Sequence, residues 1–160
     1  MCRQHDNLVS MTQVGDPRHS VSIAAAVVDE FGRVLVTKRR DNGRWEPPGG
    51  VLEAEESILD GLKREVFEET GLTVEPVRLT GVYKNMVRGI VALVFLARIR
   101  AGEPATSDET SRVEWWTPEM ISERMDPAYS VRILDALRQD GPAVRAHDGT
   151  SILTDLAALP

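Results

Sequence analysis

The stretch that most constrains this chain is Gly50–Leu72, which has the pattern of a single acidic helix. Ser57 suits the N-cap of such a helix, and Gly71 suits the position just after its end. Three apolar side chains recur at the i, i+3, i+7 spacing of a buried stripe: Leu59, Leu62 and Val66. The stretch therefore predicts a helix over residues 58–70.

Three glutamates crowd the end of this helix. Glu65, Glu68 and Glu69 stand at i, i+3 and i+4, so they project close together from its last two turns. Each opposes the helix dipole at about 0.3–1 kcal/mol, and each pair repels at about 0.2–0.5 kcal/mol. Lys63 projects to another side, and Arg64 alone cannot neutralise three carboxylates. We therefore expect a divalent cation among them and a raised pKa for at least one glutamate.

The wider pattern of the stretch resembles a known family motif. A bare acidic run is usually a solvated helix face, but here the spacing of glycines, glutamates, arginine and apolar residues resembles the Nudix box without a departure. The matching positions are Gly50, Glu56, Arg64, Glu65, Val66, Glu68, Glu69, Gly71 and Leu72. The resemblance implies an α/β fold, the Nudix-type α/β/α sandwich with a mixed β-sheet between helices.

The resemblance also implies a reaction and roles for the box residues. Nudix hydrolases cleave a nucleoside diphosphate linked to another group with the help of Mg²⁺ or Mn²⁺, and water attacks a phosphorus of the pyrophosphate. Glu68 and Glu69 would bind metal, and Glu65 would bind metal or orient the water. Arg64 would pair with Glu56 to hold the array.

Further site residues are expected outside the helix. A backbone carbonyl near Gly49 or Gly50 joins the metal shell in the resembled family, and glycine lets the chain approach an ion closely. Arg39 and Arg40 lie in a basic cluster ten residues before Gly49 and Gly50, which we call the glycine loop. The cluster suits either a phosphate contact or a solvated strand end. Trp45 suits either stacking on a base or packing within the loop.

A later loop is expected to complete the metal shell, because two or three helix carboxylates leave it incomplete. Glu109, in the polar loop before the last predicted strand, is the first choice, and Glu114 on that strand is the second. Each of these glutamates is otherwise a solvated charge.

The rest of the chain predicts a layered α/β domain, with strands on both sides of the acidic helix and helices near the end. We expect a loose N-terminal arm over 1–20, a single Nudix hydrolase domain over 21–139 and a weakly patterned C-terminal extension over 140–160. The expected strands cover 21–29, 34–38, 74–83, 90–99 and 112–116, with a shaped loop at 41–49, a short helix from residue 118 and a helix over 128–139.

Composition narrows the classes of partner. A net charge of −6 disfavours a long nucleic acid, which requires a basic surface, but it is compatible with a small nucleotide escorted by metal. Cys2 is the single cysteine, so no intrachain disulfide can form. No apolar run suits a membrane span or a signal peptide, so we expect a cytoplasmic protein with no membrane partner. A homodimer is left open.

Two other functions belong to this fold. One is a non-catalytic, nucleotide-sensing domain, which has no reason to keep all four box glutamates. The other is isopentenyl diphosphate isomerase, which uses a cysteine within its site, whereas Cys2 lies in the N-terminal arm.

The expected substrate is a nucleoside triphosphate or an oxidised nucleotide, because the sequence lacks the features typical of enzymes for other substrates. ADP-ribose pyrophosphatases tend to carry a proline about 16 residues beyond the box, where this chain has Met86-Val87-Arg88-Gly89. ADP-ribose or a nucleotide sugar is the alternative.

Overall fold

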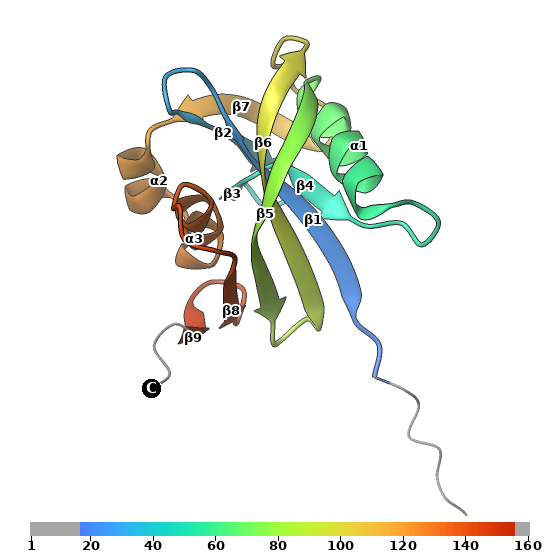
Figure 1. Cartoon of the computed structure of the whole chain (residues 1–160), viewed down its shortest axis with the longest axis vertical. Coiled ribbons are helices and arrows are strands. Elements are labelled where there is room, and N and C mark those ends of the chain that lie inside the picture. Colours follow the sequence, from blue (N-terminus) through green and yellow to red (C-terminus); the bar gives the residue numbers. More distant parts are fainter. Residues whose placement is uncertain (1–16, 156–160) are drawn as a thin grey trace, which may run out of the picture.

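The computed structural model describes residues 17–155, so most of the expected arm over 1–20 lies outside the described residues. A mixed sheet forms the middle layer, with α1 against one face and α2 and α3 against the other (Figure 1). This confirms the expected α/β/α sandwich. The elements in chain order are β1 (Ser20–Val28), β2 (Val34–Arg39), β3 (Trp45–Glu46), β4 (Gly49–Val51), α1 (Ile58–Thr70), β5 (Thr73–Asn85), β6 (Ile90–Ala101), β7 (Thr110–Trp116), α2 (Pro118–Arg124), α3 (Pro127–Ala136), β8 (Ala143–His147) and β9 (Ile152–Asp155).

The sheet combines parallel and antiparallel pairs. Its main order is β3-β2-β1-β6-β5-β8-β9, while β4 pairs with β1 and β7 pairs with β2. The pairs β1–β6 and β5–β8 are parallel, and the others are antiparallel. No helix within residues 17–155 has both the length and the apolar character that a membrane crossing requires.

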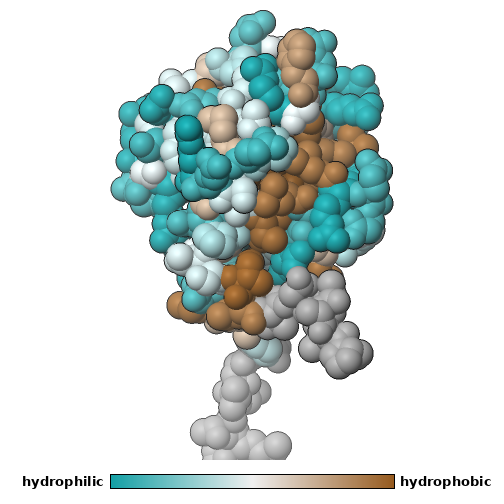
Figure 2. Space-filling view, turned by 90° about the vertical axis from the view of Figure 1, so that its left-hand side faces the viewer, coloured by the Kyte–Doolittle hydropathy of each residue, from teal (hydrophilic) through white to brown (hydrophobic). Residues whose placement is uncertain are grey.

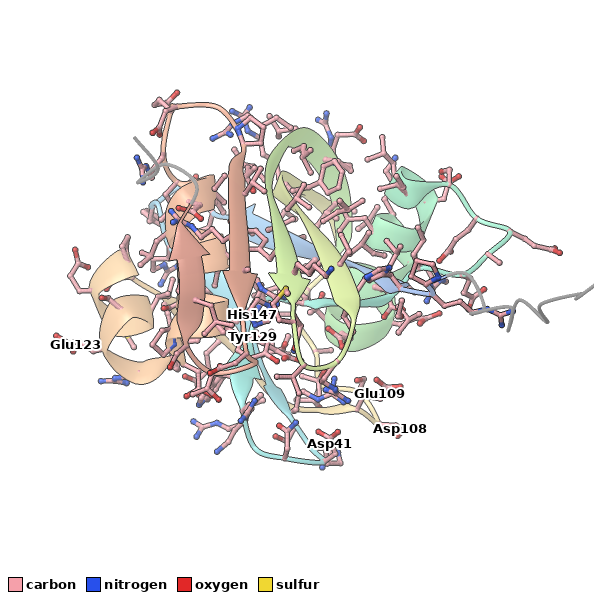
Figure 3. The ribbon with its side chains drawn as sticks, turned by 90° about the horizontal axis from the view of Figure 1, so that it is seen from below. Asp41, Asp108, Glu109, Glu123, Tyr129 and His147 are labelled. Carbon is pink, nitrogen blue, oxygen red and sulfur yellow. The ribbon has the colours of Figure 1, made fainter. Side chains whose placement is uncertain are left out.

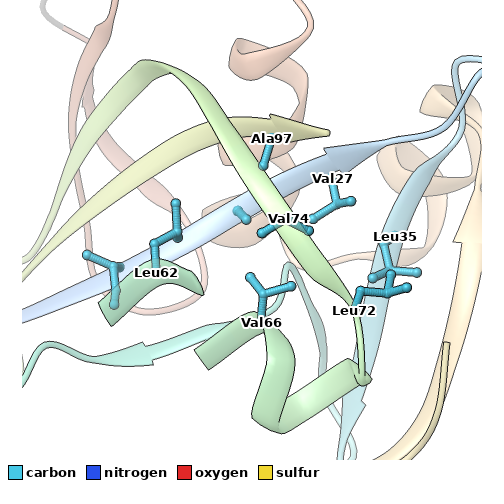
Figure 4. Packing of buried hydrophobic residues seen from close by; sticks show 9 residues of the cluster. Val27, Leu35, Leu62, Val66, Leu72, Val74 and Ala97 are labelled. Atoms are coloured by element: carbon cyan, nitrogen blue, oxygen red, sulfur yellow. The ribbon is translucent and has the colours of Figure 1, made fainter. Parts of the chain in front are cut away.

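Strand β1 is buried on both faces, which explains its nearly continuous apolar sequence. On one face, Ile23, Ala25 and Val27 pack with Leu62 and Val66 of α1 (Figure 4). On the other face, alternate residues of β1 pack towards α2 and α3. That second core includes Ala26, Val34, Val36, Trp116, Ile121 and Ile133. Figure 2 shows an apolar band on the side of the molecule that carries these two helices.

Helix α1 begins and ends as predicted. The Ser57 hydroxyl accepts the Asp60 N–H at 3.2 Å, and Gly71, with φ of 75°, donates its N–H to the Phe67 carbonyl. The prediction for Leu59 is wrong, because this side chain is 45% exposed. The first turn extends beyond the core, and the buried face continues instead to Glu69 near the other end of the helix.

Two segments contain strands that local sequence did not predict. Within the loop expected over 41–49, Trp45–Glu46 pairs with β2, and Gly49–Val51, which begins at the loop's last residue, pairs with β1. Beyond residue 139, β8 pairs in parallel with β5, and β9 pairs with β8. These short strands are fixed by their partners rather than by a periodic pattern of their own.

Candidate functional site

Arg64 gathers three of the four box glutamates. Its guanidinium binds Glu56 through two hydrogen bonds, Nε to Oε2 at 2.9 Å and Nη2 to Oε1 at 2.6 Å. Its Nη1 atom donates to Glu65 at 2.8 Å and to Glu68 at 3.2 Å. The expected ion pair between Arg64 and Glu56 is therefore present, and it joins the loop before α1 to the middle of the helix.

Glu69 stands apart from Arg64 and is buried. It is 6% exposed, and its Oε2 atom accepts the Gly49 N–H at 3.0 Å. Burial is the main cause that raises the pKa of Glu69 to about 8, and the charges of Glu46 and Glu65 add to the rise. A raised pKa within this cluster was expected from mutual repulsion, but removal from water is the larger cause.

Glu65 lies against the backbone of the glycine loop. A Cβ atom added to Gly50 would stand 2.5 Å from the Glu65 carboxyl carbon, so a side chain at residue 50 would displace this carboxylate. Burial raises the pKa of Glu65 even though Arg64 donates a hydrogen bond to it. Glycine at residue 50 thus permits close approach of the backbone to a carboxylate, whereas the predicted approach to a metal ion stays a prediction.

The donor chemistry of this cluster fits a hard divalent cation. Magnesium prefers carboxylate and carbonyl oxygens, and Glu65 and Glu69 are carboxylates whose pKa values burial raises. Within residues 17–155, however, no three His, Cys, Asp or Glu side chains are gathered as a metal ion would hold them. Arg64 explains this arrangement, because it draws Glu65 and Glu68 towards itself and leaves Glu69 with Gly49.

The two candidate ligands from later in the chain lie in different surroundings. Glu109 is exposed, and its charge contributes to the raised pKa of Glu65, although less than burial does. Glu114 contacts the Trp116 indole N–H at 2.7 Å and the Arg112 guanidinium at 2.6 Å. Since neighbouring Val113 packs on the α1 side, Glu114 points to the opposite face of β7. Glu114 therefore does not share a site with the α1 carboxylates, and Glu109 is the better proposal.

The two arginines of the basic cluster, Arg39 and Arg40, make different contacts. Arg39 pairs with Asp41 through two hydrogen bonds, at 2.9 and 2.7 Å, and lies 3.3 Å from Glu46. Arg40 donates instead to the backbone carbonyls of the 107–110 loop, including that of Asp108 at 3.1 Å. Arg40 thus holds the loop that carries Glu109.

Trp45 packs inside the fold. Its ring centroid lies 4.6 Å from that of Trp116, and it adjoins the core beneath α2 and α3. Of the two interpretations of this residue, the structure agrees with packing.

A cavity of about 350 Å³ adjoins the glycine loop. Its wall includes Gly49, Gly50, Arg39, Arg88, Tyr129 and Arg132. Figure 3 shows His147 and Tyr129, which both adjoin Arg132, near the middle of the view, and shows Asp41, Asp108 and Glu109 on neighbouring loops. A second cavity, of about 980 Å³, is lined by none of the charged residues of the box.

Sequence reasoning missed three residues of this region. Gly61 lets the preceding loop pack on α1, because a Cβ atom there would lie 2.7 Å from a Glu56 oxygen. Glu46 and Arg132 come from distant parts of the chain and meet only at the cavity. A glycine inside a predicted helix signals close packing, whereas nothing local marks the other two.

Comparison with known proteins agrees with the motif. The model of the NUDIX domain matches residues 18–137. A MutT-like protein of Streptomyces ambofaciens is 55% identical over 137 residues, which cover 86% of this chain and 89% of that protein. The 8-oxo-dGDP phosphatase NUDT18 of Danio rerio is 38% identical over 92 residues, which cover 55% of this chain but only 28% of that protein.

The fold is also shared with solved structures. An ADP-ribose pyrophosphatase from Streptococcus suis superposes with a TM-score of 0.67 at 22% identity, covering 81% of this chain and 100% of that chain. Identity at this level shows the fold alone. The motif, the matched domain and the close relative together assign the family: the chain belongs to the Nudix hydrolases, which act on nucleoside diphosphates linked to another group.

Proposed function

We propose that this chain is a metal-dependent pyrophosphohydrolase whose substrate is a nucleoside triphosphate or an oxidised nucleotide, with Mg²⁺ or Mn²⁺ as the metal. One observation carries the proposal. Gly49 and Gly50 contact the Glu69 and Glu65 side chains and also form part of the wall of the 350 Å³ cavity. A cavity of this size can hold a nucleoside, and the two glycines connect its wall to the carboxylates.

The proposed metal ligands are Glu65, Glu68 and Glu69, with the Gly50 carbonyl and Glu109 completing the shell. When bound there, the metal neutralises charge on the phosphoryl oxygens and on the leaving group. Glu65 and Glu68 would have to leave Arg64 to serve as ligands, while Glu56 keeps its paired hydrogen bonds with that arginine.

The remaining steps use groups of the chain itself. Arg39 lines the cavity and is proposed to bind phosphate oxygens. Glu65 is proposed to accept the proton of the attacking water as the new P–O bond forms and the P–O–P bond breaks, which releases a nucleoside monophosphate and pyrophosphate from a triphosphate substrate. Arg64 and Glu56 act as positioning residues, because they fix the helix carboxylates rather than contact substrate.

The substrate class is tested by a release assay over three groups of compounds: nucleoside triphosphates including oxidised ones, nucleotide sugars with ADP-ribose, and dinucleotides. Each is incubated with the protein and Mg²⁺, and then with Mn²⁺, and products are separated by chromatography. We expect the triphosphate group to be cleaved fastest. Faster cleavage of ADP-ribose or a nucleotide sugar would overturn the substrate, and no cleavage of any compound would favour a sensing domain.

A further inference from the structure

Arg132 is a buried arginine in the wall of the cavity. The residue is 9% exposed, and its guanidinium lies 4.9 Å from the ring centre of Tyr129 and 5.6 Å from that of Tyr83. Its Nε atom donates to the Ala128 carbonyl at 3.1 Å, one turn earlier on α3. The guanidinium plane is therefore held by its own helix and by two aromatic rings.

A histidine from β8 holds another edge of the guanidinium. Arg132 Nη2 lies 3.1 Å from His147 Nε2, and the Gly149 N–H donates to His147 Nδ1 at 3.0 Å. Within residues 17–155, no carboxylate forms an ion pair with Arg132, and no hydrogen bond involves its Nη1 atom. Arginine carries two N–H bonds on that atom, so the cavity wall offers a donor pair that the protein does not use.

Asn85 adds a further donor to the same wall. Its Oδ1 atom accepts the backbone N–H groups of Val87 at 3.1 Å and Arg88 at 3.0 Å, which orients the side-chain amide. The amide nitrogen is then the remaining polar group of this buried side chain, which also lines the cavity. Both fixed polar groups therefore donate, and their ligand must offer oxygen or nitrogen acceptors.

The acceptor could come from a nucleobase carbonyl or from a phosphate. Two features of the cavity favour the base. The proposed function assigns the phosphates to Arg39, and the negative charge of Glu46 partly offsets the positive charge of Arg132. Tyr129 presents an aromatic ring, which suits a planar base.

We propose that Arg132, with Asn85, determines base specificity by donating hydrogen bonds to a carbonyl oxygen of the nucleobase. The cavity then selects bases with an oxo group at this position, such as hypoxanthine or uracil, over their amino counterparts, adenine and cytosine. An amino group at this position would face the N–H groups of Arg132 with its own N–H groups, so the buried guanidinium would have no acceptor. The inference rests on the proposed nucleotide substrate, and it names the part of the substrate that the cavity reads.

Binding of nucleosides to the metal-free protein tests this inference without hydrolysis. Inosine is compared with adenosine and uridine with cytidine, and the backbone amide of Gly149 is followed by NMR during each titration. We expect each oxo member to bind about 10–100-fold more tightly than its amino partner. Arg132→Met should bring that ratio close to one, while the control Arg138→Met, an exposed arginine paired with Asp140, keeps the wild-type ratio.

A titration with inorganic pyrophosphate separates the two sources of the acceptor. Arg132→Met should leave pyrophosphate binding unchanged. If it weakens pyrophosphate binding and preserves the base preference, the guanidinium binds phosphate and the inference is wrong.

Two further measurements test the inference even if Arg132→Met does not fold. Arg132→Lys keeps the charge but loses the planar pair of donors, so its preference should fall below the wild-type value; an unchanged preference would overturn the inference. Equal affinity of the wild type for oxo and amino nucleosides would overturn it without any variant. Failure of hydrolysis alone would instead count against the proposed function, because these titrations contain neither metal nor a pyrophosphate ester.

Discussion

Glu69 shows how the environment of a single residue shapes this site. Its side chain is nearly excluded from water, and it accepts a hydrogen bond from the backbone N–H of Gly49. The pKa of Glu69 rises to about 8 in the folded chain, from 4.5 as the ordinary value. A bound divalent cation would reverse this, because it favours the ionised carboxylate.

The raised pKa predicts how stability depends on pH when no metal is present. The contribution of Glu69 to stability is complete below pH 4.5 and is lost as the pH rises through about 8, because the folded chain holds the proton more tightly. Glu69→Gln cannot ionise, so it should exceed the wild type in unfolding free energy at pH 9 by about 1 kcal/mol or more. Urea unfolding in EDTA at pH 5, 7 and 9 measures this.

Exposed Glu123 on α2 provides the control for that comparison. Glu123→Gln should follow the wild-type pH profile. The same profile for Glu69→Gln and the wild type would show that Glu69 is ionised without metal.

At the scale of elements, β4 joins the sheet to the carboxylates of α1 through two adjacent glycines with different constraints. A Cβ atom at Gly49 would lie 2.1 Å from the Ile23 carbonyl oxygen and 2.6 Å from Ala24 Cα, which are backbone atoms of β1. At Gly50 the obstacle is the Glu65 carboxylate, the far end of a flexible side chain.

These constraints predict that an alanine substitution at Gly49 mainly lowers stability, whereas the same substitution at Gly50 mainly lowers turnover. Gly49→Ala should lower the unfolding free energy by about 1–3 kcal/mol or more, because strand pairing must shift. Gly50→Ala should cost less than about 1 kcal/mol but lower turnover at least tenfold, because Glu65 must move. Urea unfolding and steady-state kinetics on both variants check this. Equal loss of stability in the two variants would contradict it.

Local sequence predicted some elements well and others poorly. The limits of α1 follow from Ser57 and Gly71, whose capping roles depend on the chain nearby. The two-residue and three-residue strands β3 and β4 are too short for a periodic pattern and exist through pairing with β2 and β1. The same holds for β8 and β9 beyond residue 139.

Parts of the site also differ in how well local sequence predicted them. The resemblance implied the ion pair of Arg64 with Glu56, and both residues lie within one loop and helix. It did not predict that the same arginine also contacts Glu65 and Glu68. The cavity wall joins β1, β3, α3 and the β5–β6 turn, and no local pattern marks Arg132 as a partner of His147.

At the scale of the whole molecule, β8 and α3 are joined by buried polar contacts. Asp135 of α3 accepts hydrogen bonds from Arg145 at 2.7 Å and from the Tyr83 hydroxyl at 2.8 Å. His147, 1% exposed, faces donors at both ring nitrogens, so the neutral ring can accept from one of them and a protonated ring from neither. These contacts tie β8 to the wall of the cavity.

His147 should therefore contribute to unfolding in acid. Burial is the main cause that lowers its pKa to about 4 from 6.5, and the charge of Arg132 adds to the effect. Its contribution to stability is complete above pH 6.5 and is lost as the pH falls towards 4, at a cost of about 3 kcal/mol. Thermal melts between pH 7 and 4 should show a smaller decline for His147→Gln than for the wild type, and parallel declines would contradict this.

The proposal that the α1 carboxylates carry metal-dependent hydrolysis is tested by turnover of the best nucleotide substrate with Mg²⁺. Initial rates are compared for the wild type, Glu68→Gln, Glu69→Gln and the control Glu123→Gln, after circular dichroism shows that each is folded. We expect Gln at residue 68 or 69 to lower turnover by about 10²-fold or more, EDTA to abolish the wild-type rate, and the control to match the wild type. Near wild-type turnover in both Glu68→Gln and Glu69→Gln would show that the α1 carboxylates do not hold the catalytic metal.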